Sequence, residues 1–451
     1  MRILHSSDWH LGQHFMGKSR DAEHRAFLDW LLTQISTHKV DALVVAGDLF
    51  DTGTPPSYAR TLYNNFIVEM RAHKCQLVVL GGNHDSVATL HESRDLLACL
   101  GTSVIGGISD NPADQVLLLK DRKQQPGALL CAIPFLRSRE LLQSQAGQSS
   151  QARQQALLQA MQQHYQTRHD EAVRQREKLD LPNLPIIATG HLTTVGGKSS
   201  ESVRDIYIGS LDAFPVSAFP PVDYMALGHL HRPQQVAGNV HIRYSGSPIP
   251  LSFDEASMEK EVVLVEFGKK GSTPQITPIP VPRSQELVLL KGTLSEVEAK
   301  LDRLLKEGAL PDETPPIQLG FEFMESLKSE PSKPETTDKA LTKPLIWLEV
   351  EIAGDDYLND LQSRMETIVA DKPVELLRVR RKRKERTTVL ERETQETLTE
   401  LSVGDVFARR LAEEAELPDE ITGSLTQAFN EIMNELAERD TAATPVEEVS
   451  A

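Results

Sequence analysis

The chain has 451 residues, of which 39% are hydrophobic and 25% are charged, and its formal net charge is −17. This length allows two or three domains, and the composition is typical of a globular protein with a sizeable core. The acidic balance argues against a protein that coats nucleic acid non-specifically. It does not exclude a nuclease, because bound cations reverse the local charge where a phosphate sits.

The first residues contain no apolar stretch long enough for a signal peptide, and no run approaches the length that crosses a bilayer. The three cysteines, Cys75, Cys99 and Cys131, lie in apolar segments and form no Cys-x-x-Cys pair. Sparse cysteines of this kind are typical of reduced core thiols rather than of metal ligands. We therefore expect a cytoplasmic protein that does not associate with membranes.

Apolar runs and helical periodicity alternate through the first half of the chain. Helices are predicted over residues 21–37, 57–73, 90–100 and 151–178, and strands over residues 2–5, 42–46, 76–80, 129–134, 186–189, 224–227, 242–244 and 262–267. The helix over 151–178 is so polar that we expect it to be solvated at the surface. Apolar strands separated by helices predict an α/β fold in which both faces of the sheet are covered.

Five short polar clusters follow these strands. They are Asp8-x-His10, Gly47-Asp48-x-x-Asp51, Gly82-Asn83-His84-Asp85, Gly190-His191 and Gly228-His229-x-His231. Open α/β sheets place their sites where strands end, so we expect all five clusters along one sheet edge. Each cluster alone is a weak signal, but the five in this order predict a single site.

The donor types in these clusters predict a pair of divalent cations. Carboxylate, amide and imidazole donors without sulfur suit manganese, iron, zinc or magnesium, and the number of histidines argues against a purely magnesium site. Two cations about 3.5–4 Å apart need one shared ligand. Asp48 has two carboxylate oxygens and follows Gly47, which lets the backbone approach closely. Paired cations cleave phosphate esters, so the sequence predicts a metal-dependent phosphoesterase.

His84 exceeds the needs of the cations. Histidine has a suitable pKa for protonating a departing alkoxide, and we expect the neighbouring Asp85 to orient the ring. We therefore predict that His84 and Asp85 are catalytic. The alternative is that His84 only forms a hydrogen bond within its loop.

Residues 1–272 are predicted to form the catalytic domain, because Pro and Thr accumulate over residues 273–283. A small α+β domain is predicted over residues 284–380, with strands over 287–290, 346–352 and 374–379 and helices over 295–306 and 357–369. Its insert, residues 310–344, is expected to be disordered. A basic linker over residues 381–395 indicates either contact with a phosphate backbone or a solvated segment balanced by nearby acid.

The last part of the chain predicts a helix-loop-helix over residues 396–438, followed by a disordered tail over 439–451. Each helix has an apolar stripe that must be buried. The pair either folds back on its own chain or, as we favour, docks on a helix of a partner.

The segments around the clusters resemble those of the calcineurin-like metallophosphoesterases and, more closely, of the bacterial branch of the double-strand-break repair nucleases. The similar segments are His5–Gly12, Gly47–Gly53, Gly82–Ser86, Ile187–Thr193, Asp205–Gly209 and Tyr244–Pro248. The resemblance covers most of the chain apart from the insert. It implies a two-sheet sandwich flanked by helices, a cap domain that contacts DNA, and a C-terminal helical pair.

The resemblance also implies a ligand set. One manganese ion would bind Asp8, His10 and His231, the other would bind Asn83, His191 and His229, and Asp48 would bridge them. His84 would be the acid. Archaeal and eukaryotic relatives carry a second histidine three residues after the bridging aspartate, where this chain has Asp51, so the role of that histidine does not transfer.

The implied activity is 3′ to 5′ exonuclease action on duplex DNA, dependent on ATP together with the partner, and endonuclease action on single strands and hairpins. The resemblance implies that this activity serves DNA repair, recombination and replication. The implied partner is SbcC, an ATPase whose coiled-coil root receives the helical pair, in a heterotetramer that contains a homodimer of this chain at the nucleoid. A phosphatase or a cyclic-nucleotide phosphodiesterase would use the same metal core, and a non-enzymatic scaffold is disfavoured by the intact ligand set.

Overall fold

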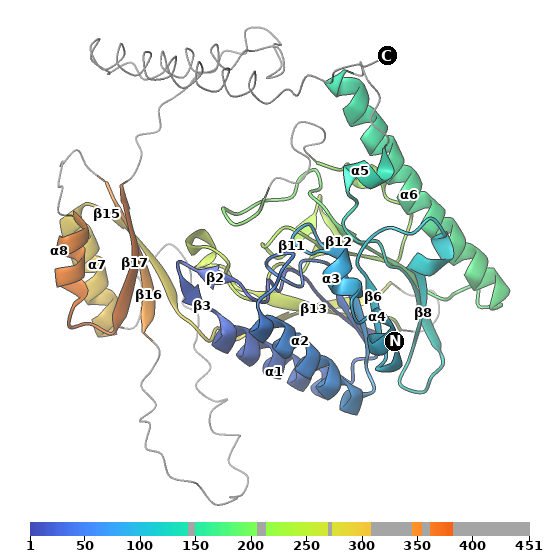
Figure 1. Cartoon of the computed structure of the whole chain (residues 1–451), viewed down its shortest axis with the longest axis horizontal. Helices are drawn as coiled ribbons and strands as arrows, with labels where there is room; N and C mark the ends of the chain where they lie inside the picture. Colours follow the sequence, from blue (N-terminus) through green and yellow to red (C-terminus); the bar gives the residue numbers. More distant parts are fainter. Residues whose placement is uncertain (143–148, 205–212, 269–272, 308–344, 354–360, 382–451) are drawn as a thin grey trace, which may run out of the picture. The chain divides into compact units, whose positions relative to one another are not determined.

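The structure is a computed structural model that describes residues 1–142, 149–204, 213–268, 273–307, 345–353 and 361–381 (Figure 1). Several predicted segments lie outside these ranges. They are the insert over 310–344, residues 205–209, the linker from residue 382 onward, the helix-loop-helix over 396–438 and the tail over 439–451.

The first sheet has six strands in the order β14-β13-β1-β4-β5-β6. Its strands are β1 (Arg2–Ser6), β4 (Ala42–Val45), β5 (Gln76–Leu80), β6 (Thr102–Ile105), β13 (Glu261–Glu266) and β14 (Gln275–Pro280). The four strands β1, β4, β5 and β6 run parallel, and β13 pairs antiparallel with both of its neighbours. Helices α1 (Asp21–Thr37) and α2 (Ser57–Met70) lie side by side and pack on the outer face (Figure 1).

The second sheet has six strands in the order β11-β12-β10-β9-β8-β7. Its strands are β7 (Val116–Lys120), β8 (Pro126–Cys131), β9 (Ile186–His191), β10 (Tyr224–Gly228), β11 (Gln234–Val236) and β12 (Asn239–Tyr244). The long helix α6 (Ser150–Lys178) covers its outer face. Leu157, Met161 and Tyr165 of α6 are fully buried there. The helix predicted over 151–178 forms, but the expectation that it is only a solvated surface helix was wrong, because its apolar edge packs on the second sheet.

The two sheets pack against each other through a shared apolar layer. Alternate residues of each strand point to opposite faces, so Leu43 packs under α1 and α2 while Val44 faces the second sheet. In the same way Leu130 faces the first sheet and Leu129 packs towards α6. Both faces of central strands such as β4 and β10 are buried, which explains why these strands are apolar without interruption. The predicted two-sheet sandwich flanked by helices is confirmed.

The first sheet extends past residue 272, where the sequence predicts the end of the catalytic domain. Residues 273–283 were expected to mark a boundary because they contain proline, but Gln275–Pro280 form strand β14 and pair with β13. β14 is an edge strand, and an edge strand tolerates Pro278 and Pro280 because one side of its backbone needs no partner. Composition alone cannot separate such a strand from a linker.

A smaller three-stranded sheet follows, in the order β15-β16-β17, with both strand pairs parallel. Its elements are β15 (Leu287–Gly292), α7 (Leu294–Glu307), β16 (Ile346–Ile352), α8 (Leu361–Val369) and β17 (Val374–Arg381). Each matches an element predicted from the sequence. The remaining elements are β2 (His14–Phe15), β3 (Lys18–Ser19), α3 (Val87–His91), α4 (Arg94–Cys99) and α5 (Ser138–Leu141), with 3₁₀ turns at 71–73, 112–115, 216–218 and 253–255. In the described ranges, no helix combines the length and apolarity of a membrane span.

Two arginines just before the predicted basic linker, Arg378 and Arg380, are neutralised within this smaller sheet. Arg378 Nε lies 2.6 Å from Glu349 Oε1, and Arg380 Nε lies 3.0 Å from the same oxygen. Arg380 also pairs with Glu351 at 2.9 Å. The Glu349 side chain is fully buried, so it depends on these arginines for its charge partner. The structure therefore indicates that the charges of Arg378 and Arg380 are balanced by nearby acidic residues, and it does not favour their contact with a phosphate backbone.

Candidate metal centre

The five predicted clusters converge, but from two sheets rather than along one sheet edge. Asp8, Asp48 and Asn83 follow β1, β4 and β5 of the first sheet. His191 ends β9 and His229 follows β10 of the second sheet. The prediction of one edge was wrong, because strand order along the chain does not reveal which sheet a strand joins. The site lies where the ends of the two packed sheets meet.

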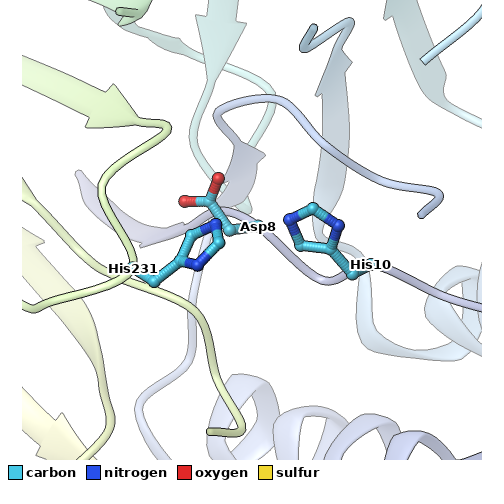
Figure 2. A group of neighbouring side chains, drawn as sticks. All are labelled: Asp8, His10 and His231. Carbon is cyan, nitrogen blue, oxygen red and sulfur yellow. The ribbon is translucent and has the colours of Figure 1, made fainter. Parts of the chain in front are cut away.

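The first group of donors is Asp8, His10 and His231, whose ligand atoms all lie within 4.8 Å of one another. Figure 2 shows the Asp8 carboxylate close to the His231 ring, with the His10 ring facing them and His231 reaching in from a separate loop. All three side chains are buried, and His10 Nε2 has no hydrogen-bond partner. A buried ring nitrogen without a partner is costly, and a cation would satisfy it.

The second group is Asp48, His191 and His229, joined by Asn83. His191 Nε2 lies 2.9 Å from Asn83 Oδ1 and 3.1 Å from Asp48 Oδ2, and His229 Nδ1 lies 3.1 Å from Asn83 Oδ1. Ligand atoms about 2.1 Å from an ion and at right angles to each other stand ~3.0 Å apart. The distances between these donor atoms therefore match those expected between neighbouring ligand atoms of one cation.

Asp48 connects the two groups through one oxygen. Its Oδ2 lies 3.7 Å from His10 Nε2 and 3.1 Å from His191 Nε2. Its Oδ1 instead accepts a hydrogen bond of 2.8 Å from the backbone N–H of His84. We expected both oxygens to take part in bridging. In the structure, only Oδ2 faces both groups, and Oδ1 holds the loop that carries His84.

The backbone around the centre is strained. Asp8, His10, Asp48 and His229 adopt φ values of 53°, 46°, 51° and 95°, which non-glycine residues seldom populate. Each such residue costs about 1–3 kcal/mol and persists only where its surroundings enforce it. Gly82 allows the close packing, because a Cβ at this position would lie 2.1 Å from Asp48 Oδ1. Strain of this kind clusters at functional sites, and here it falls on four predicted ligands.

Two of the histidines are oriented through their Nδ1 atoms. His10 Nδ1 lies 3.1 Å from Asp51 Oδ1, and His191 Nδ1 lies 2.9 Å from the carbonyl oxygen of Ala46. A partner that accepts the Nδ1 proton leaves Nε2 unprotonated and free for a cation. Asp51, which the sequence placed in a polar cluster but did not assign to either cation, thus supports a predicted ligand. The donor set and its supports fit a pair of divalent cations.

His84 lies beside the centre, with its ring 4.6 Å from that of His10, centroid to centroid. Its Nδ1 is 2.7 Å from the carbonyl oxygen of Asp51. This carbonyl therefore orients the ring, and not the Asp85 carboxylate that the sequence suggested. Burial lowers the pKa of His84 more than the nearby Asp48 raises it.

Asp85 organises the loops. Its carboxylate accepts hydrogen bonds from the backbone N–H groups of Leu49, Phe50 and Gly82 at 3.0, 2.9 and 2.9 Å. Hydrogen bonds to a charged group are worth about 1.5–3 kcal/mol each. Burial and the neighbouring Asp48 raise the pKa of Asp85 to about 6. Asp85 acts by joining the loop of Asp48 to the loop of Asn83 and His84.

Sequence reasoning missed Arg137, which holds the same loop from the other side. Arg137 Nη2 donates to the carbonyl oxygens of Gly82 at 3.3 Å and Asp85 at 2.8 Å. Its guanidinium also lies over the ring of Phe135, which packs edge-on against His191. The sequence could have indicated Arg137, because it lies shortly after the strand predicted over residues 129–134, just as the polar clusters lie after other predicted strands.

Without cations, the clustered carboxylates favour protonated histidines in the centre. Burial opposes a charged ring, but the Asp48 carboxylate outweighs it and raises the pKa of His191 to about 9. The pKa of His10 is also raised, because Asp51 and Asp48 outweigh its burial. His191 is therefore protonated at neutral pH in the metal-free protein.

Cation binding is expected to release protons. A ring nitrogen must be unprotonated to bind a metal, so binding at pH 7 should displace the His191 proton, and affinity should rise as pH increases towards about 9. Calorimetric titration in buffers of different ionisation enthalpy measures the release, which we expect to be on the order of one proton or more for each pair of ions. A binding enthalpy that is the same in every buffer would contradict this.

Comparisons with known proteins define the class. Residues 1–233 match the family described as "Calcineurin-like phosphoesterase". The matched region covers more than half of the chain and contains every donor described above. The chain belongs to this class, and it is a dimetal phosphodiesterase.

The chain belongs, more narrowly, to the SbcD family, whose members are the D subunits of the nuclease SbcCD. Residues 283–415 match the family SbcD_C, described as "Type 5 capsule protein repressor C-terminal domain". The chain is 48% identical to the SbcD nuclease of Escherichia coli (strain K12), over 97% of this chain and 99% of that protein. The SbcD nucleases of Rhodobacter capsulatus and Bacillus subtilis are 40% and 32% identical, over 69% and 67% of this chain and 77% and 75% of their own lengths.

Proposed function

We propose that this chain is the manganese-dependent DNA nuclease component of an SbcCD complex. The observation that carries the proposal is the single Asp48 oxygen that faces both His10 and His191, with His84 beside it. A bound cation pair polarises a phosphodiester and activates water for attack. The seven donors are Asp8, His10, Asp48, Asn83, His191, His229 and His231.

His84 supplies the proton in this proposal. Because its Nδ1 is engaged by the Asp51 carbonyl, its Nε2 is the nitrogen that can face a leaving oxygen. The departing 3′-oxygen of DNA is a poor leaving group, and a positioned acid lowers its barrier. The low pKa of His84 makes the neutral ring dominant, and the negative phosphate of a bound substrate favours its protonation.

DNA is the proposed substrate because the relatives carry the name nuclease and because the similarity extends beyond the metal core. It spans 97% of this chain, including the β15–β17 sheet that follows the catalytic domain. A phosphatase or a cyclic-nucleotide phosphodiesterase needs only the core. We propose 3′ to 5′ exonuclease action on duplex ends, endonuclease action on single strands and hairpins, and a role in repair.

The test of substrate class compares two reactions of the full-length protein with manganese. We expect nicking of circular single-stranded DNA and removal of nucleotides from duplex 3′ ends. A plain phenyl phosphodiester should be hydrolysed through the same centre but more slowly. Efficient hydrolysis of a phosphomonoester or a cyclic nucleotide, without cleavage of DNA, would instead establish the alternative.

The proposed partner is the SbcC ATPase, with two copies of this chain in a heterotetramer. The relatives are named as parts of SbcCD, and residues 396–438 carry the predicted helical pair. We expect a chain truncated after Arg392 to lose association with SbcC in size-exclusion chromatography while keeping manganese-dependent endonuclease activity. Co-elution of the truncated chain with SbcC would refute the assignment of these helices.

A further inference from the structure

Glu255 and Lys260 form a buried ion pair that none of the five clusters includes. Lys260 Nζ lies 2.6 Å from Glu255 Oε2, and the two side chains are 3% and 0% exposed. Glu255 ends a 3₁₀ turn, and Lys260 directly precedes β13. Buried charges are expensive to desolvate, so such a pair calls for a role beyond stability.

Both members of the pair reach His231, one of the proposed cation ligands. Lys260 Nζ donates to the carbonyl oxygen of His231 at 2.9 Å and to Ser247 Oγ at 2.8 Å. Glu255 Oε1 lies 3.4 Å from His231 Nδ1, and Ser202 stands between them. Ser202 Oγ is 2.6 Å from His231 Nδ1 and donates to Glu255 Oε1. The main chain and the ring of His231 are thus both held.

The direction of these hydrogen bonds fixes the tautomer. Glu255 accepts on Oε1 and pairs with Lys260 on Oε2, so the Ser202 hydroxyl gives its proton to Glu255. Its lone pair then accepts the proton on His231 Nδ1, which leaves Nε2 unprotonated. Asp51 and the Ala46 carbonyl hold the Nδ1 atoms of His10 and His191 in the same way, so these rings would also present Nε2 once a cation displaces their extra proton.

We propose that Glu255 and Lys260, acting through Ser202, are positioning residues for the cation held by Asp8, His10 and His231. The inference rests on the proposed function, since it requires the cation pair. Partners that orient a metal-binding histidine are typically worth 10–100-fold in metal affinity. Within the described part of the chain, no hydrogen bond or ion pair joins this network directly to Asn83, His191 or His229, which would hold the other cation.

The chain offers a matched pair of serines for the test. Ser202 contacts both His231 and Glu255, whereas Ser200 Oγ donates to the same Glu255 oxygen at 2.7 Å without a described contact to His231. Ser202→Ala therefore removes the relay to the ligand. Ser200→Ala keeps the Ser202 hydroxyl and removes a support of the carboxylate and of Ser202, whose Oγ lies 3.1 Å from Ser200 Oγ. A second route is the double variant Glu255→Gln with Lys260→Met, which removes both charges together and avoids leaving one buried alone.

The experiment titrates the metal-free, full-length protein with Mn²⁺ and counts bound ions by electron paramagnetic resonance. We expect two ions for the wild type and for Ser200→Ala. In Ser202→Ala and in the double variant, one ion should bind about 10–100-fold more weakly while the other is unchanged. Glu349→Gln, which disturbs a buried ion pair away from the centre, should bind both ions as the wild type does. Thermal unfolding verifies that each variant is folded.

The outcomes separate the two proposals. A wild type that binds fewer than two ions would refute the cation pair and with it the proposed function. If the wild type binds two ions, wild-type affinities in Ser202→Ala would refute the positioning role alone. If both ions bound equally weakly in Ser202→Ala, or if Ser200→Ala lost as much affinity, the network would be only a general structural support. Either result would also refute the positioning role. If the double variant does not fold, the two serine variants decide.

Discussion

Asp48→Asn should reduce DNA cleavage by more than about 10³-fold, because it neutralises the carboxylate whose Oδ2 faces both donor groups. Losing one preorganised electrostatic stabiliser costs about 10²–10³ in rate, and here the attachment of two cations weakens together. Asparagine is the suitable replacement, since the φ of 51° at this position is tolerated by asparagine and strained for alanine. Single-turnover cleavage of a hairpin with saturating Mn²⁺ measures the effect.

Asp41→Asn is the matched control. Asp41 precedes the same strand, β4, at its opposite end, and its buried carboxylate accepts hydrogen bonds from the backbone N–H groups of Arg2 and Arg122. We expect this variant to lose stability but to keep both cations and near-normal turnover. Equal loss of activity in the two variants would show that Asp48 acts through the fold and not through the cations.

His84→Gln should leave Mn²⁺ binding intact and slow the cleavage of DNA by roughly 10²–10⁴-fold, the usual contribution of a positioned general acid. His84 belongs to neither proposed ligand set, so the number of bound ions should remain two. The loss should be much smaller on a 4-nitrophenyl phosphodiester, because 4-nitrophenolate departs without a proton. The ratio of the two rate losses therefore isolates proton donation from a general disturbance of the loop.

His91→Gln serves as the control for this variant. His91 ends α3, seven positions further along, and its Nε2 accepts a hydrogen bond from the backbone N–H of Gly106 at 3.0 Å. It should affect neither substrate by more than a small factor. An equal loss on DNA and on the nitrophenyl ester in His84→Gln would remove the proton-donor role and leave His84 as a residue that shapes the site.

Much of the fold follows from local sequence signals. Strands such as Ala42–Val45 are apolar at every position because both faces are buried, and helices α1 and α2 repeat apolar residues at helical spacing. The strand pattern alone did not reveal the division into two sheets, which only the resemblance to the phosphoesterase family implied. The amino-acid pattern of a buried strand is the same whether the next strand along the chain joins the same sheet or the facing sheet. The edge strand β14 was missed for a related reason, since its prolines favour a loop until a pairing partner is known.

The ligands themselves were predictable because hard donors follow several strands in succession. Their supports were harder to find. Asp51 and Asp85 lie within the motifs, but only geometry separates the carboxylate that orients His10 from the one that receives three backbone N–H groups. Glu255 and Arg137 lie in no motif at all. They contact the centre through long-range packing, which a linear pattern does not encode.

Crystals of the full-length protein soaked in MnCl₂ give the most direct test of the central claim, by anomalous diffraction at the manganese edge. We expect two anomalous peaks about 3.5–4 Å apart, with Asp48 Oδ2 between them. One peak should contact Asp8, His10 and His231, and the other Asn83, His191 and His229. A single peak, or two peaks that do not share Asp48, would contradict the account.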